Sequence, residues 1–278
     1  MIHIRKTLLA ALFLAFAASG FQPAASQEGQ KLSINGTQIY YEVRGDGPPL
    51  LLLHYFGGCG QAWQPHVERL AKHYRLIIPD MRGHGRSTNP SNQFTHRQSA
   101  LDMFALLDQL GIQRCKAMGM SSGGMTLIHM ATQQPKRVED MVLIGATTYF
   151  PAQARGIMRR SVPDSLTTAE REEWGQCSAL GEAQTREVLG QFHRMKDSYD
   201  DMNFTEPYLA TITARTLIVH GDRDEFFPVD IPVQMYGAIP RSYLWIIPNG
   251  GHIPVFGKAA AIFQDKALAF LQGGWEKI

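Results

Sequence analysis

The sequence has 278 residues, of which 44% are hydrophobic, 19% are charged and 10% are aromatic. This composition excludes a disordered, collagen-like or fibrous repeat protein, and the length suits one large α/β domain or two small ones. Lysine and arginine together number 27 against 25 acidic residues, an excess too small to indicate a nucleic-acid partner.

The first 26 residues have the layout of a secretory signal peptide. Arg5 and Lys6 form a short positive region, residues 7–20 are uncharged and mostly small or apolar, and small residues follow at 24–26. The uncharged run is shorter than the roughly 20 residues that span a bilayer. We therefore predict cleavage after Ser26, or earlier after Gly20, and export to the periplasm or the medium. Residues 27–278 then remain, with 25 basic and 25 acidic residues and no membrane anchor.

The three cysteines are too few for a disulfide framework, and none has a metal-ligand spacing. Cys115 lies in an apolar run and is predicted to be a small buried residue. Separation along the chain carries no geometry, so the sequence leaves open whether Cys59 and Cys177 pair.

Short apolar runs alternate with segments of helical periodicity. An Asn35-Gly36 pair between two alternating runs predicts a β-hairpin over residues 32–43. Further strands are predicted at residues 49–53, 75–79, 115–120, 138–144, 216–220 and 243–247. Helices are predicted at residues 98–110, 125–133 and 258–271. This alternation predicts an α/β fold with a mostly parallel sheet and helices on both faces.

The alternation is interrupted at about residues 151–207, which we call the insert. It is rich in Arg, Glu, Met and aromatic residues and has no clear strand pattern. We predict a small helical excursion placed over one end of the sheet.

The sharpest motif is Gly119-Met120-Ser121-Ser122-Gly123, at the junction of a predicted strand and helix. In that context the G-x-S-x-G pattern predicts a nucleophilic Ser121 on a tight, strained turn. The glycines are needed there because side chains would collide with the neighbouring strand and helix. The backbone N–H of Ser122, directly after the nucleophile, is a predicted donor to the oxyanion.

A serine nucleophile needs a base that is itself oriented by an acid. Asp222 and Asp224 follow the predicted strand 216–220, and His252 follows the strand 243–247. The chain order Ser, Asp, His is that of the nucleophile-elbow class of serine enzymes.

With these motifs in place, the chain resembles the α/β-hydrolase superfamily over about residues 32–271. The resemblance rests on the His54 loop, the segment Asp80 to Ser87, the Ser121 turn, the Gly221 to Pro228 loop and Gly251-His252. It implies an α/β-hydrolase fold in residues 27–278, with the insert as a small helical cap.

The resemblance implies a catalytic triad of nucleophile Ser121, acid Asp224 and general base His252. The family places its acid three residues after the glycine of the loop and four before the proline, and Asp224 meets both spacings. Its rival Asp222 is expected to cap the loop or face solvent. No carboxylate follows the strand 138–144 directly, where some relatives carry the acid.

The resemblance also implies that the Phe56 backbone N–H is the second oxyanion donor. The family usually has Gly where Tyr55 stands, so the shape of the oxyanion hole differs here. The Tyr55 ring either borders the substrate pocket, where its hydroxyl would supply a further donor, or packs beneath the loop.

Aromatic and methionine side chains of the insert are candidates for the pocket or for the insert's own core, namely Met158, Trp174, Phe192, Met195, Tyr199, Met202 and Phe204. Phe226, beside Asp224, is a further pocket candidate together with Phe227. The insert has 7 basic and 10 acidic residues, so it indicates no anionic substrate.

The remaining histidines are expected to be structural. His66, His73, His96 and His193 fall on predicted helices or surface loops, and His129 is expected to be packed and hydrogen-bonded. No His, Asp or Glu spacing resembles a zinc site, so we expect neither a metal nor a cofactor.

The expected reaction is hydrolysis of a small carboxylic ester or lactone through an acyl-enzyme. A serine in the nucleophile position argues against dehalogenase or epoxide hydrolase chemistry, which use a carboxylate in this superfamily. The alternatives are an aminopeptidase, a cofactor-free peroxidase or C–C hydrolase, and a non-catalytic ligand receptor, because a fold does not choose among them. The oligomeric state is open.

Overall fold

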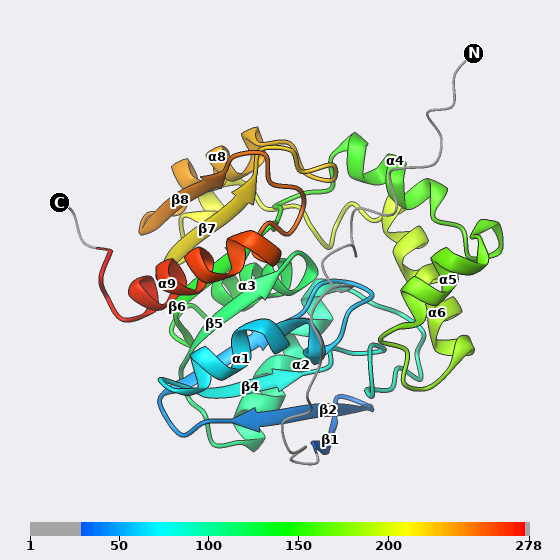
Figure 1. Ribbon diagram of the computed structural model, residues 1–278, viewed down its shortest axis with the longest axis horizontal. Coiled ribbons are helices and arrows are strands. Elements are labelled where there is room, and N and C mark those ends of the chain that lie inside the picture. Colours follow the sequence, from blue (N-terminus) through cyan, green and yellow to red (C-terminus); the bar gives the residue numbers. More distant parts are fainter. Residues whose placement is uncertain (1–28, 276–278) are drawn as a thin grey trace.

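One sheet of eight strands organises the computed structural model, which describes residues 29–275 (Figure 1). The strands are β1 (Gln30–Ile34), β2 (Thr37–Arg44), β3 (Pro49–Leu53), β4 (Arg75–Pro79), β5 (Cys115–Met120), β6 (Val138–Ile144), β7 (Arg215–Gly221) and β8 (Ser242–Ile247). Their order across the sheet is β1-β2-β4-β3-β5-β6-β7-β8. Strands β1 and β2 are antiparallel to their neighbours, and the other six run parallel. The predicted α/β class and mostly parallel sheet are confirmed.

The β1–β2 hairpin forms at the predicted Asn35-Gly36 pair. Both residues have positive φ, 45° for Asn35 and 75° for Gly36. A two-residue turn with two such dihedrals matches the twist of antiparallel strands, and Asn and Gly tolerate them best.

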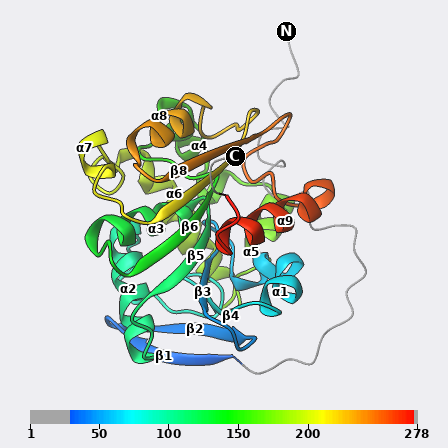
Figure 2. The same cartoon turned by 90° about the vertical axis from the view of Figure 1, so that its left-hand side faces the viewer.

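Helices cover both faces of the sheet (Figure 2). They are α1 (Gln64–Ala71), α2 (His96–Gln109), α3 (Ser122–Gln133), α4 (Ala152–Arg160), α5 (Thr168–Gly175), α6 (Glu182–Arg194), α7 (Glu206–Leu209), α8 (Asp230–Ala238) and α9 (Ala260–Leu271). Helices α2, α3 and α8 enclose one hydrophobic core, and α1 with α9 enclose a second core on the opposite face. The strands between them are buried on both sides, which explains their continuous apolar sequences.

Three predicted helices are present with shifted starts. Helix α2 begins at His96 because the Thr95 side chain caps it, accepting a hydrogen bond from the Gln98 backbone N–H at 3.0 Å. Helix α3 begins at Ser122, before the glycines that weaken its sequence signal. A short 3₁₀ turn, Gly257–Ala259, precedes α9. Helices α1 and α8 were not predicted from periodicity.

The insert is helical, as predicted, and no strand forms within its described residues. Helices α4, α5 and α6 lie together beyond one end of the sheet (Figure 1). The predicted signal peptide, residues 1–26, lies outside the described residues. Within residues 29–275, no helix combines the length and apolar character needed to cross a bilayer.

The buried His66 should make the free energy of unfolding depend on pH. It is fully buried on α1, between the rings of Phe256 and Phe263, and burial lowers its pKa to about 4. The folded state therefore binds this proton less readily than the unfolded chain, in which the pKa is about 6.5. The stabilisation is complete above about pH 6.5 and is lost as the pH falls toward 4.

Replacing this histidine should reduce the acid sensitivity. Between pH 7 and pH 4.5, His66→Leu is expected to lose roughly 2–3 kcal/mol less unfolding free energy than the wild type, because no proton is taken up at this position on unfolding. Urea denaturation followed by circular dichroism at both pH values measures the difference. The exposed His73 is the matched control, since His73→Leu should keep the wild-type pH dependence. Equal losses in His66→Leu and wild type would contradict the prediction.

Candidate active site

The turn between β5 and α3 holds Ser121 in a strained backbone conformation. Its φ is 48° and its ψ is −112°, a combination that costs a non-glycine residue free energy. The Ser121 backbone N–H donates to the Ile144 carbonyl on β6 at 2.7 Å, and the Met125 backbone N–H donates to the Ser121 carbonyl at 2.9 Å. Hydrogen bonds to β6 and to α3 therefore hold the strained Ser121 in place.

Two glycines let the strand and the helix come close enough to form this turn. A Cβ at Gly119 would collide with the backbone of Gly123 and Gly124, and a Cβ at Gly123 would collide with the carbonyls of Leu53 and His54. The collisions predicted for G-x-S-x-G are present at both glycines.

The structure brings Ser121, His252 and Asp224 into one hydrogen-bonded chain. His252 Nε2 lies 2.9 Å from Ser121 Oγ, and His252 Nδ1 lies 2.8 Å from Asp224 Oδ2. Asp224 Oδ1 accepts from the backbone N–H groups of Phe226 and Phe227 at 2.7 and 3.0 Å. With its carboxylate so oriented, His252 carries its proton on Nδ1, which leaves Nε2 to accept from the serine hydroxyl.

Asp222 takes no part in this chain. Its nearest charged partner is Arg223, on the surface at 3.9 Å, and its Oδ1 has no hydrogen bond among the described residues. Of the two rivals in the loop, only Asp224 reaches His252.

The loops carrying Asp224 and His252 are packed directly on each other. A Cβ at Gly221 would collide with the carbonyls of Gly250 and Gly251, and the Arg223 backbone N–H donates to the Gly250 carbonyl at 2.8 Å. Because Gly221 has no side chain, the two loops approach closely enough for the acid to reach the imidazole.

Asp224 is held as a carboxylate. Burial alone would raise its pKa, but the facing His252, the more distant His220 and the Phe227 backbone N–H together lower it. An acid that stays ionised keeps the His252 tautomer fixed and stabilises the ring when it is protonated.

Both predicted oxyanion donors border the space in front of Ser121. Phe56 and Ser122 line the same cavity as Ser121 and His252. Ser122 is the first residue of α3, so the helix does not use its N–H, and no acceptor for the backbone N–H of either residue occurs among the described residues.

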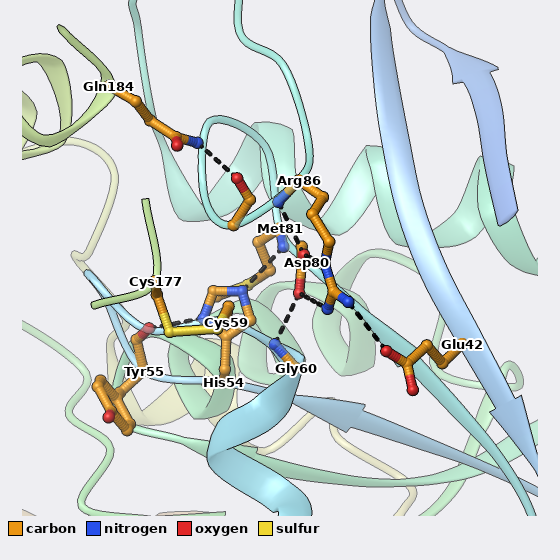
Figure 3. Close-up of a disulfide and its surroundings, with 11 residues drawn as sticks. Glu42, His54, Tyr55, Cys59, Gly60, Asp80, Met81, Arg86, Cys177 and Gln184 are labelled. Atoms are coloured by element: carbon orange, nitrogen blue, oxygen red, sulfur yellow. Dashed lines mark hydrogen bonds and ion pairs between the residues drawn. A yellow bond between two sulfur atoms is a disulfide. The ribbon is translucent and has the colours of Figure 1, made fainter. Parts of the chain in front are cut away.

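The loop that carries Phe56 is anchored to the start of the segment after β4. His54 Nε2 accepts from the Met81 backbone N–H at 2.9 Å, and His54 Nδ1 donates to the Tyr55 carbonyl at 2.7 Å. Figure 3 shows the His54 ring between these two partners. The imidazole thus holds the loop from both of its ring nitrogens.

The cavity at Ser121 is narrow, and its wall is almost wholly apolar. The predicted pocket residues Tyr55, Trp174 and Phe226 all line it. The other lining residues are Phe56, His96, Ser121, Ser122, Met125, Phe150, Met158, Phe192, Met195, Phe227 and His252. No Lys, Arg, Asp or Glu of the described chain is among them.

The insert's apolar residues divide between the cavity and other roles. All of the predicted pocket or core candidates in the insert except the exposed Tyr199 belong to the hydrophobic core. Four of these core residues also line the cavity, namely Met158, Trp174, Phe192 and Met195. Arg155 lies over the Tyr199 ring at 3.9 Å.

Tyr55 borders the cavity and also packs within the loop. Its ring lies against Gly58, and the side chain belongs to the core on the α1 and α9 face. Burial, with a smaller effect of Glu173, raises the pKa of its hydroxyl to about 12. Tyr55 is therefore a neutral group at the wall of the cavity.

A disulfide joins the insert to the loop beside the predicted oxyanion hole. Cys59 and Cys177, which are 118 residues apart, are bonded, whereas Cys115 is free and buried as predicted. The next residue after Cys59, Gly60, donates its N–H to Asp80 Oδ1 at 2.7 Å, and Asp80 pairs with Arg86 (Figure 3). On the insert, Gln184 donates to the carbonyls of Gly83 and Gly85 at 3.0 and 2.9 Å.

Trp174, three residues before Cys177 in the sequence, packs on the loop that the disulfide joins to the insert. The Trp174 ring packs against Gly57, leaving no room for a side chain there, and it contacts Phe192 with 5.4 Å between ring centroids. The insert is thereby held over Ser121 with an aromatic wall facing the loop of Phe56.

Two residues that sequence patterns did not single out lie at the site. His96 was expected on a helix or a surface loop; it begins α2 but is buried and lines the cavity. Asp201, from the insert, lies within hydrogen-bond distance of it. Neither residue belongs to a motif, and the only available signal was the Thr95 cap, which predicts a helix start at His96.

The other histidines have structural partners. His129 Nε2 donates to the Asp201 carbonyl at 2.7 Å, and His220 Nε2 donates to the Phe227 carbonyl at 2.9 Å. Within residues 29–275, no three His, Cys, Asp or Glu side chains are grouped as metal ligands would be.

A mostly parallel eight-stranded sheet with a serine at a strained strand–helix turn defines the class of protein. The chain belongs to the α/β-hydrolase fold family, whose pattern it matches over residues 48–189.

Relatives in this family carry out several reactions. The chain is 24% identical to a pimeloyl-[acyl-carrier protein] methyl ester esterase of Vibrio vulnificus (strain YJ016), over 84% of this chain and 98% of the esterase. It is 28% identical to a 2-hydroxy-6-oxononadienedioate/2-hydroxy-6-oxononatrienedioate hydrolase of Pseudomonas putida, over 84% and 92% of the two chains. Its fold is similar to the crystal structure of the enol-lactonase from Burkholderia xenovorans LB400, with a TM-score of 0.73, 22% identity and coverage of 87% and 100%.

The disulfide predicts a redox-dependent stability. Replacing both cysteines in Cys59→Ser/Cys177→Ser should lower the unfolding free energy by about 2–4 kcal/mol, because a bond closing a loop this long restricts the unfolded chain. Thermal unfolding with and without dithiothreitol measures it, and reductant should shift the wild type alone. Thiol titration of the denatured, unreduced protein should find one thiol, that of Cys115. Three thiols would contradict the pairing.

Proposed function

We propose that the protein is a serine hydrolase that cleaves small carboxylic esters or lactones through an acyl-enzyme. The observation that carries the proposal is the hydrogen-bonded chain Ser121–His252–Asp224, opening on a cavity that Phe56 and Ser122 also line. Nucleophile, base and acid lie within hydrogen-bond reach before any substrate is bound.

The steps follow from this geometry. Ser121 Oγ attacks the ester carbonyl carbon while its proton passes to His252 Nε2, and the carbonyl oxygen takes the negative charge between the Phe56 and Ser122 N–H groups. As the tetrahedral intermediate collapses, the C–O bond to the alcohol breaks and His252 protonates the alcohol oxygen. Water, deprotonated by His252, then attacks the carbonyl carbon of the acyl-enzyme. The bond from that carbon to Ser121 Oγ breaks, His252 returns the proton to Oγ, and the carboxylic acid leaves.

The cavity wall favours an uncharged, apolar acyl group. An aminopeptidase would require a carboxylate to bind the free amine of its substrate, and none lines the cavity of the described chain. A dioate substrate, as named for the Pseudomonas putida relative, would require a cation there, and the wall likewise has no Lys or Arg. The esterase relative and the lactonase neighbour agree with the ester or lactone assignment.

We further propose that the protein is exported. The N-terminal signal-peptide pattern and the Cys59–Cys177 disulfide both support this, since disulfides persist in oxidising compartments. Fractionation of cells producing the full chain, with N-terminal sequencing of the product, tests the proposal. Recovery of the uncleaved chain in the cytoplasm would refute it.

The mature protein should hydrolyse p-nitrophenyl esters in a panel of increasing acyl length, assayed beside lactones and aminoacyl amides. Ser121→Ala should lower kcat on the best substrate at least about 10³-fold, because it removes the nucleophile, while the melting temperature stays within a few degrees of wild type. An unchanged rate in Ser121→Ala would overturn the mechanism. Specific ligand binding with no turnover across the panel would favour the receptor alternative.

The acid is tested by two matched substitutions in one loop. Asp224→Asn should lower kcat about 10³-fold or more, because the amide stabilises the wrong tautomer of His252. Asp222→Asn, two residues away and without contact to His252, should stay within about two-fold of wild type. The opposite ranking would assign the acid to Asp222.

A further inference from the structure

A second Ser–His–Asp chain lies beside the first. Ser122 Oγ lies 2.9 Å from His96 Nε2, and His96 Nδ1 lies 2.6 Å from Asp201 Oδ2. Ser122 and His96 are each about 1% exposed, and the Asp201 side chain is 7% exposed. The chain runs from the residue after the predicted nucleophile, through the first residue of α2, to the insert.

The two chains have the same atomic pattern. In each, one carboxylate oxygen accepts from an imidazole Nδ1, and Nε2 of that imidazole faces a serine hydroxyl at 2.9 Å. In each, backbone N–H groups orient the carboxylate, those of Phe226 and Phe227 in one case and those of His96 and Arg97 in the other.

Asp201 fixes the tautomer of His96. Its carboxylate lies at the N-terminus of α2, where it accepts the His96 and Arg97 backbone N–H groups at 2.8 and 3.0 Å. Burial alone would raise the pKa of Asp201, but His96 and these backbone groups lower it to about 2. An ionised acceptor places the His96 proton on Nδ1, so Nε2 accepts the hydroxyl proton of Ser122.

The backbone separates the roles of the two serines. Ser121 has the strained dihedrals of the turn and projects into the cavity, whereas Ser122 has entered α3 and its carbonyl accepts from Thr126 Oγ1 at 3.0 Å. Without an acceptor, the hydroxyl of a serine in a first turn bonds to nearby backbone groups and competes for them. His96 removes the Ser122 hydroxyl from that competition.

From this geometry we infer that His96 and Asp201 are positioning residues: they clamp the Ser122 hydroxyl so that the Ser122 backbone N–H stays free and aimed at the oxyanion. The inference rests on the proposed hydrolase function. It makes the insert part of the catalytic geometry, because Asp201 is an insert residue whose main-chain carbonyl is also bonded by His129.

Residues that orient the Ser122 backbone N–H toward the oxyanion should stabilise the transition state more than the bound substrate. Ser122→Ala, His96→Phe and Asp201→Asn should each lower kcat about 10- to 100-fold and leave KM within about two-fold, since the ground-state ester does not require the full oxyanion interaction. His66→Leu is the matched control: it alters a buried histidine on α1 that packs against Phe256 and Phe263 and contacts neither Asp201 nor Ser122, and its kcat should stay within two-fold of wild type.

Two further readouts separate this role from a merely structural one. Butylboronic acid, which forms a tetrahedral adduct on Ser121, should bind each variant more weakly by about the factor lost in kcat. The double variant Ser122→Ala/His96→Phe should be no slower than the worse single variant, because both cut one chain. Where Asp201→Asn does not fold, as judged by circular dichroism, Ser122→Ala and His96→Phe carry the test.

The outcomes distinguish this inference from the proposed function. Absence of ester and lactone turnover in the wild type would refute the hydrolase. Wild-type turnover that depends on Ser121, with normal kcat and boronate affinity in Ser122→Ala and His96→Phe, would refute the clamp alone. Turnover that survives Ser121→Ala and is lost in Ser122→Ala would also overturn it, by making the second chain the nucleophilic one.

Discussion

The close approach of α3 to strands β3 and β5 is the constraint on which the site depends. Glycine at 119 and 123 removes the side chains that would push the helix away, and the helix can then begin directly at the strand end. Ser121 is left as the residue that absorbs the sharp change of direction, in a backbone conformation that only its surroundings maintain. Because α3 begins at Ser122, the Ser122 backbone N–H is not used by the helix. The packing of α3 on the sheet therefore accounts both for the projecting Ser121 hydroxyl and for the free Ser122 N–H.

The insert is held over this turn by contacts of several kinds at several points. The disulfide attaches it beside the loop of Phe56, Gln184 attaches it to the turn after β4, and Asp201 attaches it to the start of α2. Between these points it contributes aromatic and methionine side chains to the cavity wall. Polar groups at the edges fix its position, and apolar groups in the middle make the wall, which suits the uncharged acyl chain of the proposed substrates.

Local patterns predicted the parts of the fold that local physics determines. The β1–β2 turn required residues that accept positive φ, and Asn35-Gly36 supplies them. The buried strands required continuous apolar runs, and strands β3, β4, β5 and β6 match the predicted bounds. The Ser121 turn was predicted from the glycines at a strand–helix junction, whereas Asp224 and His252 were assigned by resemblance to a family that places its acid and base after later strands. Helices α1 and α8 were not predicted; each is short, and α8 exposes Val233 and Tyr236, which blurs its apolar face.

The sequence could not indicate which residues far apart along the chain contact each other in the folded protein. Cys59 and Cys177 are 118 residues apart, and no spacing rule links them. His96 and Asp201 are 105 residues apart, and a lone histidine at a helix start resembles an ordinary surface residue until a buried carboxylate is found beside it. Such pairs are set by how the insert sits on the sheet, which is a tertiary property.

The two hydrogen-bonded chains also constrain what the cavity can recognise. Before any reaction, His252 and His96 are each held on one side by a carboxylate and on the other by a serine, so neither ring has a nitrogen free to bind a substrate group in the ground state. The Ser122 hydroxyl is likewise committed, and Tyr55 contributes a neutral phenol. The serine and histidine side chains of the wall therefore use their hydrogen-bonding capacity to orient one another. Under the proposed function, binding energy must then come mainly from the apolar contact of Met and aromatic side chains with the acyl group, while the polar groups act on the charge that develops during the reaction. For the proposed ester or lactone hydrolase, a site divided in this way implies selection by size and shape and poor discrimination between an open ester and a lactone of similar bulk.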